Sequence, residues 1–384
     1  MSLSTPTDAR PRVMQLRSSA GLFGADRMVL ALNGALPGVG VDSRLASINN
    51  YLTPEQALHR SAIARGQACE LLPCRSRVDM TTLSRLREQV RGHRIDVLHA
   101  HDYKSATYAW LATRGLAVRR VATLHGQVEA TRSLRLYNRI ERAVLRGFDA
   151  LAVVAHCQVD GLSAAGIPRD RIQVIDNGIE LDDNAHAPSR VLIERFGLQA
   201  RPFVFGAVAR FSPEKNLGQL VEAFARIARA ETRCVLLLVG DGPEADALKA
   251  QCDALGLHGR VRFTGVMDDM QRVYPLIDCL VLPSLSEGMP LTVLEAMDHA
   301  LPVIASDVGE VGRLLAASDE GRLVPRQDLH ALASAMADRL RAGRATDTTA
   351  REYVRSRHSP EAMARRYRDL YLAVKGACDD AHAA

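Results

Sequence analysis

Short apolar runs alternate with longer amphipathic stretches along almost the whole chain. Each run has the length of a buried strand, and most are followed by ten or more residues with helical periodicity, which predicts repeated βα units and parallel sheets. The runs form two series, each long enough for a doubly wound sheet, so we expect an α/β protein with two Rossmann-like domains. The predicted strands are residues 13–16, 97–99, 121–124, 151–154 and 172–175 in the first series, and 203–208, 235–239, 261–263, 279–282 and 302–305 in the second.

The domain boundary is expected where the first series ends. Asn177 follows its last apolar run, and a polar, irregular stretch with Pro188 precedes the restart of the pattern at Phe203. We therefore expect an N-terminal domain over residues 1–177, a linker over 178–190 and a C-terminal domain over 191–358. A predicted helix over 359–375 and a frayed tail over 376–384 complete the chain.

Composition and charge narrow the class of protein. The 384 residues are 47% hydrophobic and 24% charged, ordinary values that exclude disordered and fibrous chains, and an aromatic content of 4% disfavours base stacking on aromatic side chains. Residues 1–11 lack the apolar core of a signal peptide, and no apolar run approaches the ~18 residues that a membrane span needs.

Seven cysteines without a Cys-x-x-Cys pair argue against disulfides and structural zinc, so we expect a reduced, cytoplasmic protein. The net charge of +5 is uneven, because residues 1–177 carry +9 and the remainder −4.

One glycine-rich turn imitates a dinucleotide-binding motif. Residues 240–245, Gly-Asp-Gly-Pro-Glu-Ala, follow an apolar run and open a predicted helix, as the G-x-G-x-x-A fingerprint does. That fingerprint also needs an acidic residue at the end of the next strand to hold the ribose, whereas here the strand ends Arg-Phe-Thr at 262–264. We interpret the segment as a turn before a helix and expect no nicotinamide cofactor.

The strongest candidate for chemistry is residues 284–297, Ser-Leu-Ser-Glu-Gly-Met-Pro-Leu-Thr-Val-Leu-Glu-Ala-Met. Pro290 favours a helix start, so Glu287 and Gly288 fall in the loop at a strand's carboxyl end, where open α/β sheets bind ligands. Glu295, about two turns into the helix, is expected to face the same crevice. A helix start also presents backbone amides that suit a phosphate, here those of Met289, Leu291 and Thr292. The spacing alone is equally compatible with a capped surface helix that carries incidental acids.

Basic partners for an anion follow another strand of the second series. Arg210 and Lys215 lie in Arg-Phe-Ser-Pro-Glu-Lys-Asn, residues 210–216, which leaves the strand at 203–208 and enters a helix. They therefore lie at a carboxyl edge, where a guanidinium and an ammonium can stabilise charge on a leaving diphosphate. Two solvated surface cations are the alternative.

In the first half, His125-Gly126 ends a strand and is placed to hydrogen-bond a substrate hydroxyl, although a structural histidine is the ordinary alternative. His99 and His101 read as strand-end packing residues, and we expect no metal site there. A glycine loop over residues 21–25, Gly-Leu-Phe-Gly-Ala, precedes a helix predicted to open at Asp26. It suits either close approach to an anion or an ordinary tight turn.

Taken in order over residues 12–375, these segments resemble the family 4 retaining glycosyltransferases, which have the GT-B fold. Glu287 and Glu295 match the family's Glu-x7-Glu motif, and Arg210 and Lys215 match its diphosphate-binding pair. His125 matches the active-site histidine that meets the donor sugar.

Two further segments extend the resemblance to both halves of the chain. Residues 177–180, Asn-Gly-Ile-Glu, match the Asn-Gly-Ile-Asp that precedes the linker in the family. Gly24 matches the second glycine of the family's Gly-Gly loop, but Phe23 stands where the family usually has the first, which places the shape of the acceptor-side loop in question.

The resemblance implies two doubly wound domains that face an interdomain cleft, with the acceptor on the first and a sugar nucleotide on the second. It also implies that the helix over residues 359–375 crosses back onto the N-terminal domain. Glu287 then lies beside the donor sugar, Glu295 holds the ribose, and the loop around Val266 pairs its backbone with the base. His125, Glu287, Arg210 and Lys215 are the expected catalytic residues. The expected donor-binding residues are Gly24, Val266, Gly288, Met289, Pro290, Leu291, Thr292 and Glu295. No Asp-x-Asp motif occurs, as in the metal-independent members of this fold class, so we expect neither a metal nor a cofactor.

A basic stripe in the first half predicts an anionic partner. Five arginines recur at spacings of three and four, which places them along one face of a helix: Arg132, Arg135, Arg139, Arg142 and Arg146. We expect this face to meet anionic lipid headgroups or a lipid-diphosphate acceptor. A solvated helix face is the alternative, and the small overall charge excess disfavours nucleic acid.

The expected function is transfer of a hexosyl unit, with retention, from a nucleotide sugar to a glycan or lipid-linked acceptor. A UDP-sugar is favoured as donor, followed by GDP-mannose, and surface polysaccharide or glycolipid assembly at the inner face of the membrane is the setting that the resemblance implies. Two alternatives remain open at this point. One is an epimerase or phosphorylase of the same architecture, and the other is a non-catalytic subunit that binds a sugar nucleotide.

Overall fold

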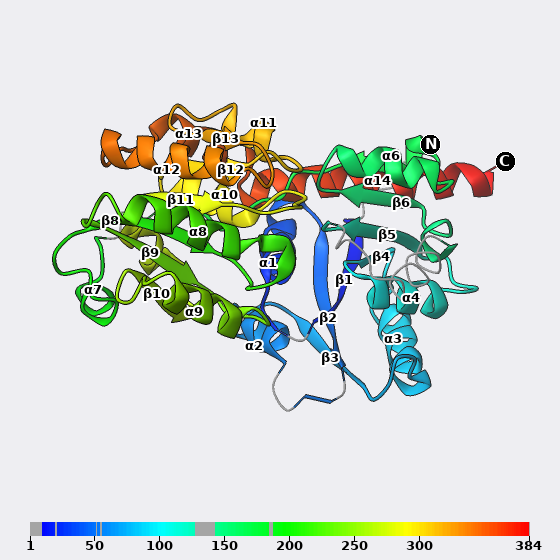
Figure 1. The fold of residues 1–384 in the computed structure, drawn as a ribbon. Helices are drawn as coiled ribbons and strands as arrows, with labels where there is room; N and C mark the ends of the chain where they lie inside the picture. The colour runs from blue at the N-terminus through cyan, green and yellow to red at the C-terminus, as the bar shows by residue number, and fades with distance from the viewer. Residues whose placement is uncertain are drawn as a thin grey trace. The chain divides into compact units, whose positions relative to one another are not determined.

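The computed structural model describes residues 10–19, 21–50, 52–53, 56–126, 143–183 and 187–383, and the side chains of these up to residue 376. The chain divides into two compact units, one formed by Met1–Glu180 together with Ser359–Ala384 and the other by Leu181–His358. Figure 1 shows that each unit is built on its own sheet.

The first unit contains a seven-stranded sheet in the order β3-β2-β1-β4-β5-β6-β7, and all its strand pairs are parallel. Its strands are β1 (Arg12–Ser18), β2 (Asp42–Asn50), β3 (Cys69–Cys74), β4 (Val97–Ala100), β5 (Arg119–Leu124), β6 (Ala150–Val153) and β7 (Ile172–Val174). The expected βα architecture is confirmed. β2 and β3 were not among the predicted strands, because Asp-Ser-Arg-Leu-Ala-Ser-Ile-Asn-Asn and Cys-Glu-Leu-Leu-Pro-Cys contain no sustained apolar run.

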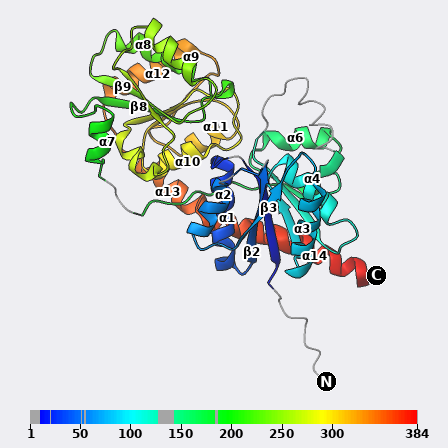
Figure 2. The same ribbon diagram turned by 90° about the horizontal axis from the view of Figure 1, so that it is seen from below.

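Helices cover both faces of this sheet. One face is packed by α3 (Met80–Gly92), α4 (Tyr103–Ala112) and α6 (Cys157–Ala164), whose side chains form an aliphatic core with β1 to β6. The other face carries α1 (Gly24–Ala35), α2 (Ala57–Ala64) and α14 (Pro360–Ala383), and α14 packs against α1 and the 3-10 helix η1 (Leu36–Val39) (Figure 2). Two helix predictions were wrong. α14 continues past residue 375, and α1 opens at Gly24 rather than Asp26, which becomes the third residue of its first turn.

The second unit contains a six-stranded sheet in the order β10-β9-β8-β11-β12-β13, again with parallel pairing throughout. Its strands are β8 (Phe203–Val208), β9 (Cys234–Val239), β10 (Val261–Gly265), β11 (Cys279–Leu282), β12 (Val303–Ser306) and β13 (Arg322–Val324). The strand β13 is a three-residue edge strand with two exposed positions, so it has no apolar run to predict it.

In this unit α8 (Leu217–Ala228), α9 (Ala245–Ala254) and α12 (Leu329–Ala342) lie on one face of the sheet, where α8 and α12 pack side by side (Figure 2). The other face carries α10 (Leu291–Asp298) and α11 (Val311–Leu315), and α10 packs against α13 (Thr348–Arg357). Short helices complete the described structure: α7 (Arg190–Arg195), η2 (Arg169–Arg171), η3 (Pro213–Lys215), η4 (Met270–Arg272) and η5 (Tyr274–Leu276).

The start of α14 rests on the Asn-Gly segment that ends the first series of strands. A Cβ on Gly178 would lie 2.7 Å from Ser359 O and 3.0 Å from Met363 Cβ, and the Gly178 amide lies 3.2 Å from Met363 Sδ. Glycine is therefore required at this position for close contact between the two ends of the unit.

Replacing that glycine tests the contact. We expect Gly178→Ala to lower the free energy of unfolding of the first unit by about 1–3 kcal/mol, because the added methyl group meets backbone. Gly38→Ala is the matched control, since a Cβ there has no neighbour within 4 Å. Thermal unfolding monitored by circular dichroism measures both variants, and equal melting temperatures would contradict this interpretation.

Candidate active site

The strand order changes direction once in each sheet. In the second sheet this happens between β8 and β11, whose following loops both leave the carboxyl edge. In the first it happens between β1 and β4. Ligands of open α/β sheets bind at such points, because the loops on the two sides diverge and leave a crevice.

At the switch point of the second sheet, the two diverging loops are joined by an ion pair. Lys215 Nζ, from the loop after β8, lies 2.6 Å from Glu287 Oε1, from the loop after β11. Ser284 Oγ donates to the same carboxylate oxygen at 2.7 Å, and the loops also meet where Leu285 N–H donates to Glu214 O at 2.8 Å. The Glu287 side chain is 9% exposed and that of Lys215 23%, so the pair is largely shielded but reaches solvent.

A glycine after β12 supports the Glu287 loop from behind. A Cβ on Gly309 would lie 2.3 Å from Glu287 O and 2.4 Å from Gly288 O, and Gly309 has a left-handed φ of +54°. The next residue, Glu310, donates its N–H to Gly288 O at 2.9 Å. No local motif in the sequence marks Gly309.

The loop that carries Arg210 is held by the glycine-rich turn after β9. A Cβ on Gly240 would lie 1.9 Å from Ala209 O, and one on Gly242 would lie 2.4 Å from Phe211 O. Phe211 N–H donates to Asp241 O, and Phe211 O accepts from Glu244 N–H. The glycines thus allow the two loops to pack closely, which explains why this turn resembles a nucleotide-binding motif. Arg210, on the loop that they support, is exposed.

The helix α10 begins beside Glu287. Pro290 is its N-cap, in extended conformation, and its C=O accepts from Val293 N–H at 3.2 Å, so the amides of Leu291 and Thr292 precede the first helical hydrogen bond. The two residues before this turn, Gly288 and Met289, are buried. Backbone N–H groups at such a position attract anions.

Glu295 is the fifth residue of α10, which places it just over one turn into the helix rather than two. Its Oε2 accepts a hydrogen bond from the buried Tyr274 hydroxyl, and the Tyr274 ring stacks on His299 with centroids 5.0 Å apart. Val266, directly after β10, has 72% of its surface exposed, so the backbone around it is reachable by a ligand.

At the switch point of the first sheet, polar side chains from three adjacent strands gather on one face. Gln15 and His99 are paired in register between β1 and β4, and His101 and His125 follow the ends of β4 and β5. His101 Nε2 lies 2.7 Å from Gln15 Oε1, and its Nδ1 lies 3.3 Å from Nε2 of His125. The structure thus joins His125 to His101, which the sequence suggested to be only a packing residue.

Burial keeps these imidazoles neutral. It lowers the pKa of His99 to about 3 and that of His101 well below 6.5. For His125 burial again has the largest effect, and with Arg17 and His99 it holds the pKa well below 6.5. His125 is therefore a neutral hydrogen-bonding group at physiological pH, not a cation.

The glycine loop is organised around a buried carboxylate. Asp26 accepts hydrogen bonds from Arg17 Nε at 2.8 Å, Ser19 Oγ at 2.9 Å and the Phe23 N–H at 2.8 Å. Gly24 is exposed at the start of α1, and the Phe23 side chain is 50% exposed beside it. These hydrogen bonds fix how the loop enters the helix, although Phe23 stands where the family usually has a glycine.

Most of the predicted basic stripe lies outside the described residues, namely Arg132, Arg135, Arg139 and Arg142. Arg146 is described, and its Nη2 donates to Ala165 O at 2.7 Å, which caps the end of α6. This arginine is therefore engaged within the first unit.

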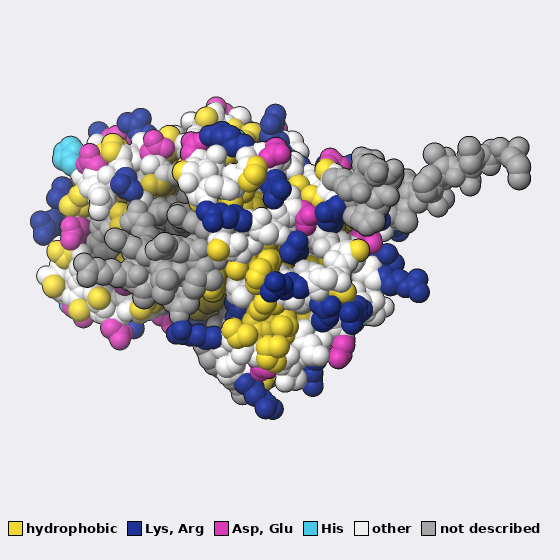
Figure 3. Space-filling view, turned by 90° about the vertical axis from the view of Figure 1, so that its right-hand side faces the viewer, with side chains coloured by type: hydrophobic (Ala, Val, Ile, Leu, Met, Phe, Trp, Pro, Cys, Tyr) yellow, Lys and Arg dark blue, Asp and Glu magenta, His cyan; other side chains and the backbone are white. Residues whose placement is uncertain are grey.

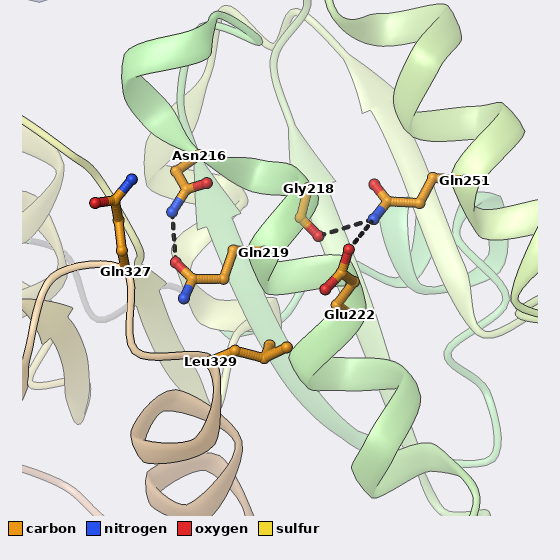
Figure 4. Close-up of a pocket in the computed structure, with 7 residues that line it drawn as sticks. All are labelled: Asn216, Gly218, Gln219, Glu222, Gln251, Gln327 and Leu329. Atoms are coloured by element: carbon orange, nitrogen blue, oxygen red, sulfur yellow. Dashed lines mark hydrogen bonds between the residues drawn. The ribbon is translucent and has the colours of Figure 1, made fainter.

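A pocket in the second unit lies apart from the residues named so far as site residues and has no assigned role. It measures about 430 Å³ and is lined mainly by polar side chains of α8, α9 and the approach to α12: Asn216, Gly218, Gln219, Glu222, Gln251, Gln327 and Leu329 (Figure 4). Gln251 Nε2 donates to Gly218 O and Glu222 Oε1, and Asn216 to Gln219, so these groups hold one another (Figure 4).

Searches for other kinds of site cover only the described part of the chain. There, no three His, Cys, Asp or Glu side chains are placed to hold a metal ion. Within the same ranges, no helix combines the length and apolarity needed to cross a bilayer.

With this geometry established, comparison with known proteins assigns the family. The sequence model of Glycosyltransferase Family 4 matches residues 24–183, and that of Glycosyl transferases group 1 matches residues 202–342. The chain belongs to the family 4 glycosyltransferases. The two matches fall on the first and second units and include the segments of His125, Glu287 and Lys215.

Individual relatives agree with this assignment. N-acetyl-alpha-D-glucosaminyl L-malate synthase of Bacillus anthracis is 27% identical over 303 residues, 77% of this chain and 79% of that protein. UDP-Gal:alpha-D-GlcNAc-diphosphoundecaprenol alpha-1,3-galactosyltransferase of Escherichia coli is 28% identical over 269 residues, 67% of this chain and 70% of that protein. Among solved structures, HepE of Anabaena in complex with UDP and glucose has a TM-score of 0.80 at 19% identity, over 95% of this chain and 100% of that one. This family 4 glycosyltransferase therefore has the GT-B fold.

The support of the Glu287 loop can be tested by substitution. We expect Gly309→Ala to lower the transfer rate about 10–100-fold, because the methyl group would push the Glu287 and Gly288 carbonyls away from their positions. Gly256→Ala is the matched control, since Gly256 also has a left-handed φ, of +67°, but a Cβ there has no neighbour within 4 Å. Steady-state rates and melting temperatures are measured together, and an equal loss of rate in both variants would show that backbone strain, not displacement of the loop, is responsible.

Proposed function

We propose that this family 4 glycosyltransferase transfers a hexosyl unit, with retention at the anomeric carbon, from a nucleotide sugar to a glycan or lipid-linked acceptor. A UDP-sugar is the favoured donor and GDP-mannose the next, and no metal ion or cofactor takes part. The setting is assembly of a surface polysaccharide or glycolipid at the cytoplasmic face of a membrane. The observation that carries the proposal is the shielded Lys215–Glu287 pair beside the start of α10.

The arrangement suits a leaving diphosphate. Lys215 and the first amides of α10 are positive groups already fixed in place, and Arg210 lies on the same loop as Lys215. Charge that develops on the departing phosphate is stabilised most by such preorganised groups. When a diphosphate binds, the Lys215 ammonium exchanges part of its attraction to Glu287 for the phosphate oxygens, while Ser284 keeps the carboxylate hydrogen-bonded.

The proposed step is a front-face displacement. The bond between the anomeric carbon and the phosphate oxygen breaks, and the acceptor hydroxyl oxygen forms the new bond on the same face. The hydroxyl proton passes to an oxygen of the departing diphosphate. Glu287 is proposed to lie beside the donor sugar, Glu295 to hold the ribose, and neutral His125 to hydrogen-bond a sugar hydroxyl.

Named relatives support the choice of substrates. The Anabaena HepE structures contain UDP and UDP-glucose. The Escherichia coli relative is named for UDP-Gal and a diphosphoundecaprenol-linked acceptor, and a Mycolicibacterium smegmatis relative, 27% identical over 79% of this chain and 78% of that protein, is a phosphatidyl-myo-inositol mannosyltransferase. We therefore propose a UDP-sugar and a lipid-linked acceptor for the first assays.

Removing the proposed phosphate ligand tests the function. We expect Lys215→Ala to lower kcat about 10²–10³-fold at saturating UDP-sugar, because a preorganised cation is lost at the leaving group. Lys249→Ala is the control, since Lys249 lies on α9 of the same unit with a 55% exposed side chain. Unchanged turnover of Lys215→Ala would contradict the proposal, and the same assay followed by proton NMR shows whether the product keeps the donor's anomeric configuration and whether EDTA has any effect.

The basic stripe is proposed to contact anionic lipid. Four arginines of the stripe, at positions 132, 135, 139 and 142, contribute to the net charge of +9 of residues 1–177. On the described surface, Figure 3 shows Lys and Arg side chains next to hydrophobic ones. Each basic residue near such a surface contributes about 1 kcal/mol.

Vesicle binding tests this part of the proposal separately. We expect the wild-type protein to cosediment with phosphatidylglycerol vesicles but not phosphatidylcholine vesicles, and Arg135→Ala/Arg139→Ala to bind the anionic vesicles about 30-fold more weakly. Arg229→Ala/Arg233→Ala, with the same charge change in the second unit, should bind as the wild type does. Equal binding of the wild type to both lipids at low salt would rule this contact out.

A further inference from the structure

A continuous chain of hydrogen bonds runs through the first unit from α14 to His125. Tyr371, on α14, lies with its hydroxyl 2.7 Å from His99 Nδ1 and accepts from Gln15 Nε2 at 3.1 Å. Gln15 Oε1 continues the chain to His101 Nε2, and His101 Nδ1 continues it to His125 Nε2. At the other end, His99 Nε2 lies 2.7 Å from Thr123 Oγ1, and that hydroxyl lies 2.8 Å from the hydroxyl of Tyr367.

Gln15 determines which atom donates and which accepts in each of these hydrogen bonds. An amide side chain donates at one end and accepts at the other, and Gln15 is fully buried between its two partners. Because its oxygen faces His101, the Nε2 atom of His101 must carry a proton. Because its nitrogen faces Tyr371, the phenol hydrogen is directed to His99 Nδ1.

The protonated nitrogen of His101 in turn determines which nitrogen of His125 carries a proton. A neutral imidazole has one N–H and one lone pair, and burial keeps both rings neutral. With its proton on Nε2, His101 accepts at Nδ1, so His125 donates from Nε2 and retains a lone pair on Nδ1. Turning the Gln15 amide over would reverse every link and place the His125 proton on Nδ1.

We infer that Gln15 is a positioning residue that fixes His125 in its Nε2–H tautomer, so that Nδ1 of His125 accepts a hydrogen bond from a substrate hydroxyl. The inference deepens the proposed function, since the benefit of an acceptor nitrogen rests on His125 meeting a sugar. The tautomer itself depends only on contacts within the first unit. Gln15 does not touch the reacting groups, and it acts through His101.

The test compares two isosteric substitutions in the same chain of hydrogen bonds. Gln15→Met removes the group that selects the direction, and Thr123→Val removes a link on the far side of His99 but leaves the contacts between Gln15, His101 and His125 intact. Two-bond proton–nitrogen correlation spectra of 15N-histidine-labelled full-length protein report which ring nitrogen carries the proton. His125→Gln and His101→Gln spectra assign the signals, and kcat and the donor KM are measured on the same variants.

We expect the wild-type His125 to be protonated at Nε2. Gln15→Met should give a mixture of tautomers and lower kcat about tenfold with less than a threefold change in KM, because one oriented hydrogen bond is lost in the transition state. Thr123→Val should keep the wild-type His125 signals. A wild-type proton on Nδ1, an unchanged tautomer in Gln15→Met, or equal changes in both variants would overturn the inference. A tautomer mixture with unchanged kcat would support the assignment of the tautomer and contradict the proposed role of His125 in transfer.

Discussion

The reversal of strand order in each parallel sheet is the constraint on which the rest of this structure depends. Between β8 and β11 it separates two loops that would otherwise run on the same side of the sheet, and the Lys215–Glu287 ion pair joins them again at 2.6 Å. A shielded ion pair is stabilising only when its remaining hydrogen-bonding capacity is met. Ser284 supplies that to Glu287, while partial exposure leaves Lys215 within reach of an incoming anion.

In the first unit, the point where the strand order reverses holds neutral polar side chains instead of an ion pair. There the switch point holds neutral imidazoles and an amide, and α14 covers them with two tyrosine hydroxyls. A charged group would be costly under that cover, which is why burial lowers the pKa of His99 rather than stabilising an imidazolium. In the proposed reaction, the second unit supplies fixed positive charge for the leaving diphosphate, and the first supplies a neutral hydrogen-bonding group for a sugar hydroxyl.

Much of this could be predicted from the sequence, for a physical reason. The α/β class follows from repeated apolar runs. Arg210, Lys215 and Glu287 are conspicuous because each lies in the loop that follows a strand, and Glu295 because it lies in the helix that the loop of Glu287 opens. The polar strands β2 and β3 could not be predicted from apolar runs, because their burial depends on neighbouring strands. Gly309 has no motif because its role is set by the backbone of residues 287 and 288.

The hydrogen bonds between Tyr371 and His125 show what the sequence can predict and what it cannot. Gln15, His99 and Thr123 each place one polar side chain inside an otherwise apolar strand segment, and this could have been noticed in the sequence. Their link to Tyr371 joins residues 356 positions apart, and only the packing of α14 on the first unit brings them together. Local patterns predict candidates, but the partner that orients each candidate comes from tertiary structure.

The most direct test of the central claim is a crystal structure of the protein with UDP bound. The claim is that the Lys215–Glu287 pair and the first turn of α10 form the diphosphate site. We predict that the diphosphate lies against the amides of Leu291 and Thr292, with Lys215 Nζ within 3.2 Å of a phosphate oxygen, about the hydrogen-bond limit. A diphosphate bound elsewhere, with the 2.6 Å ion pair unchanged, would contradict it.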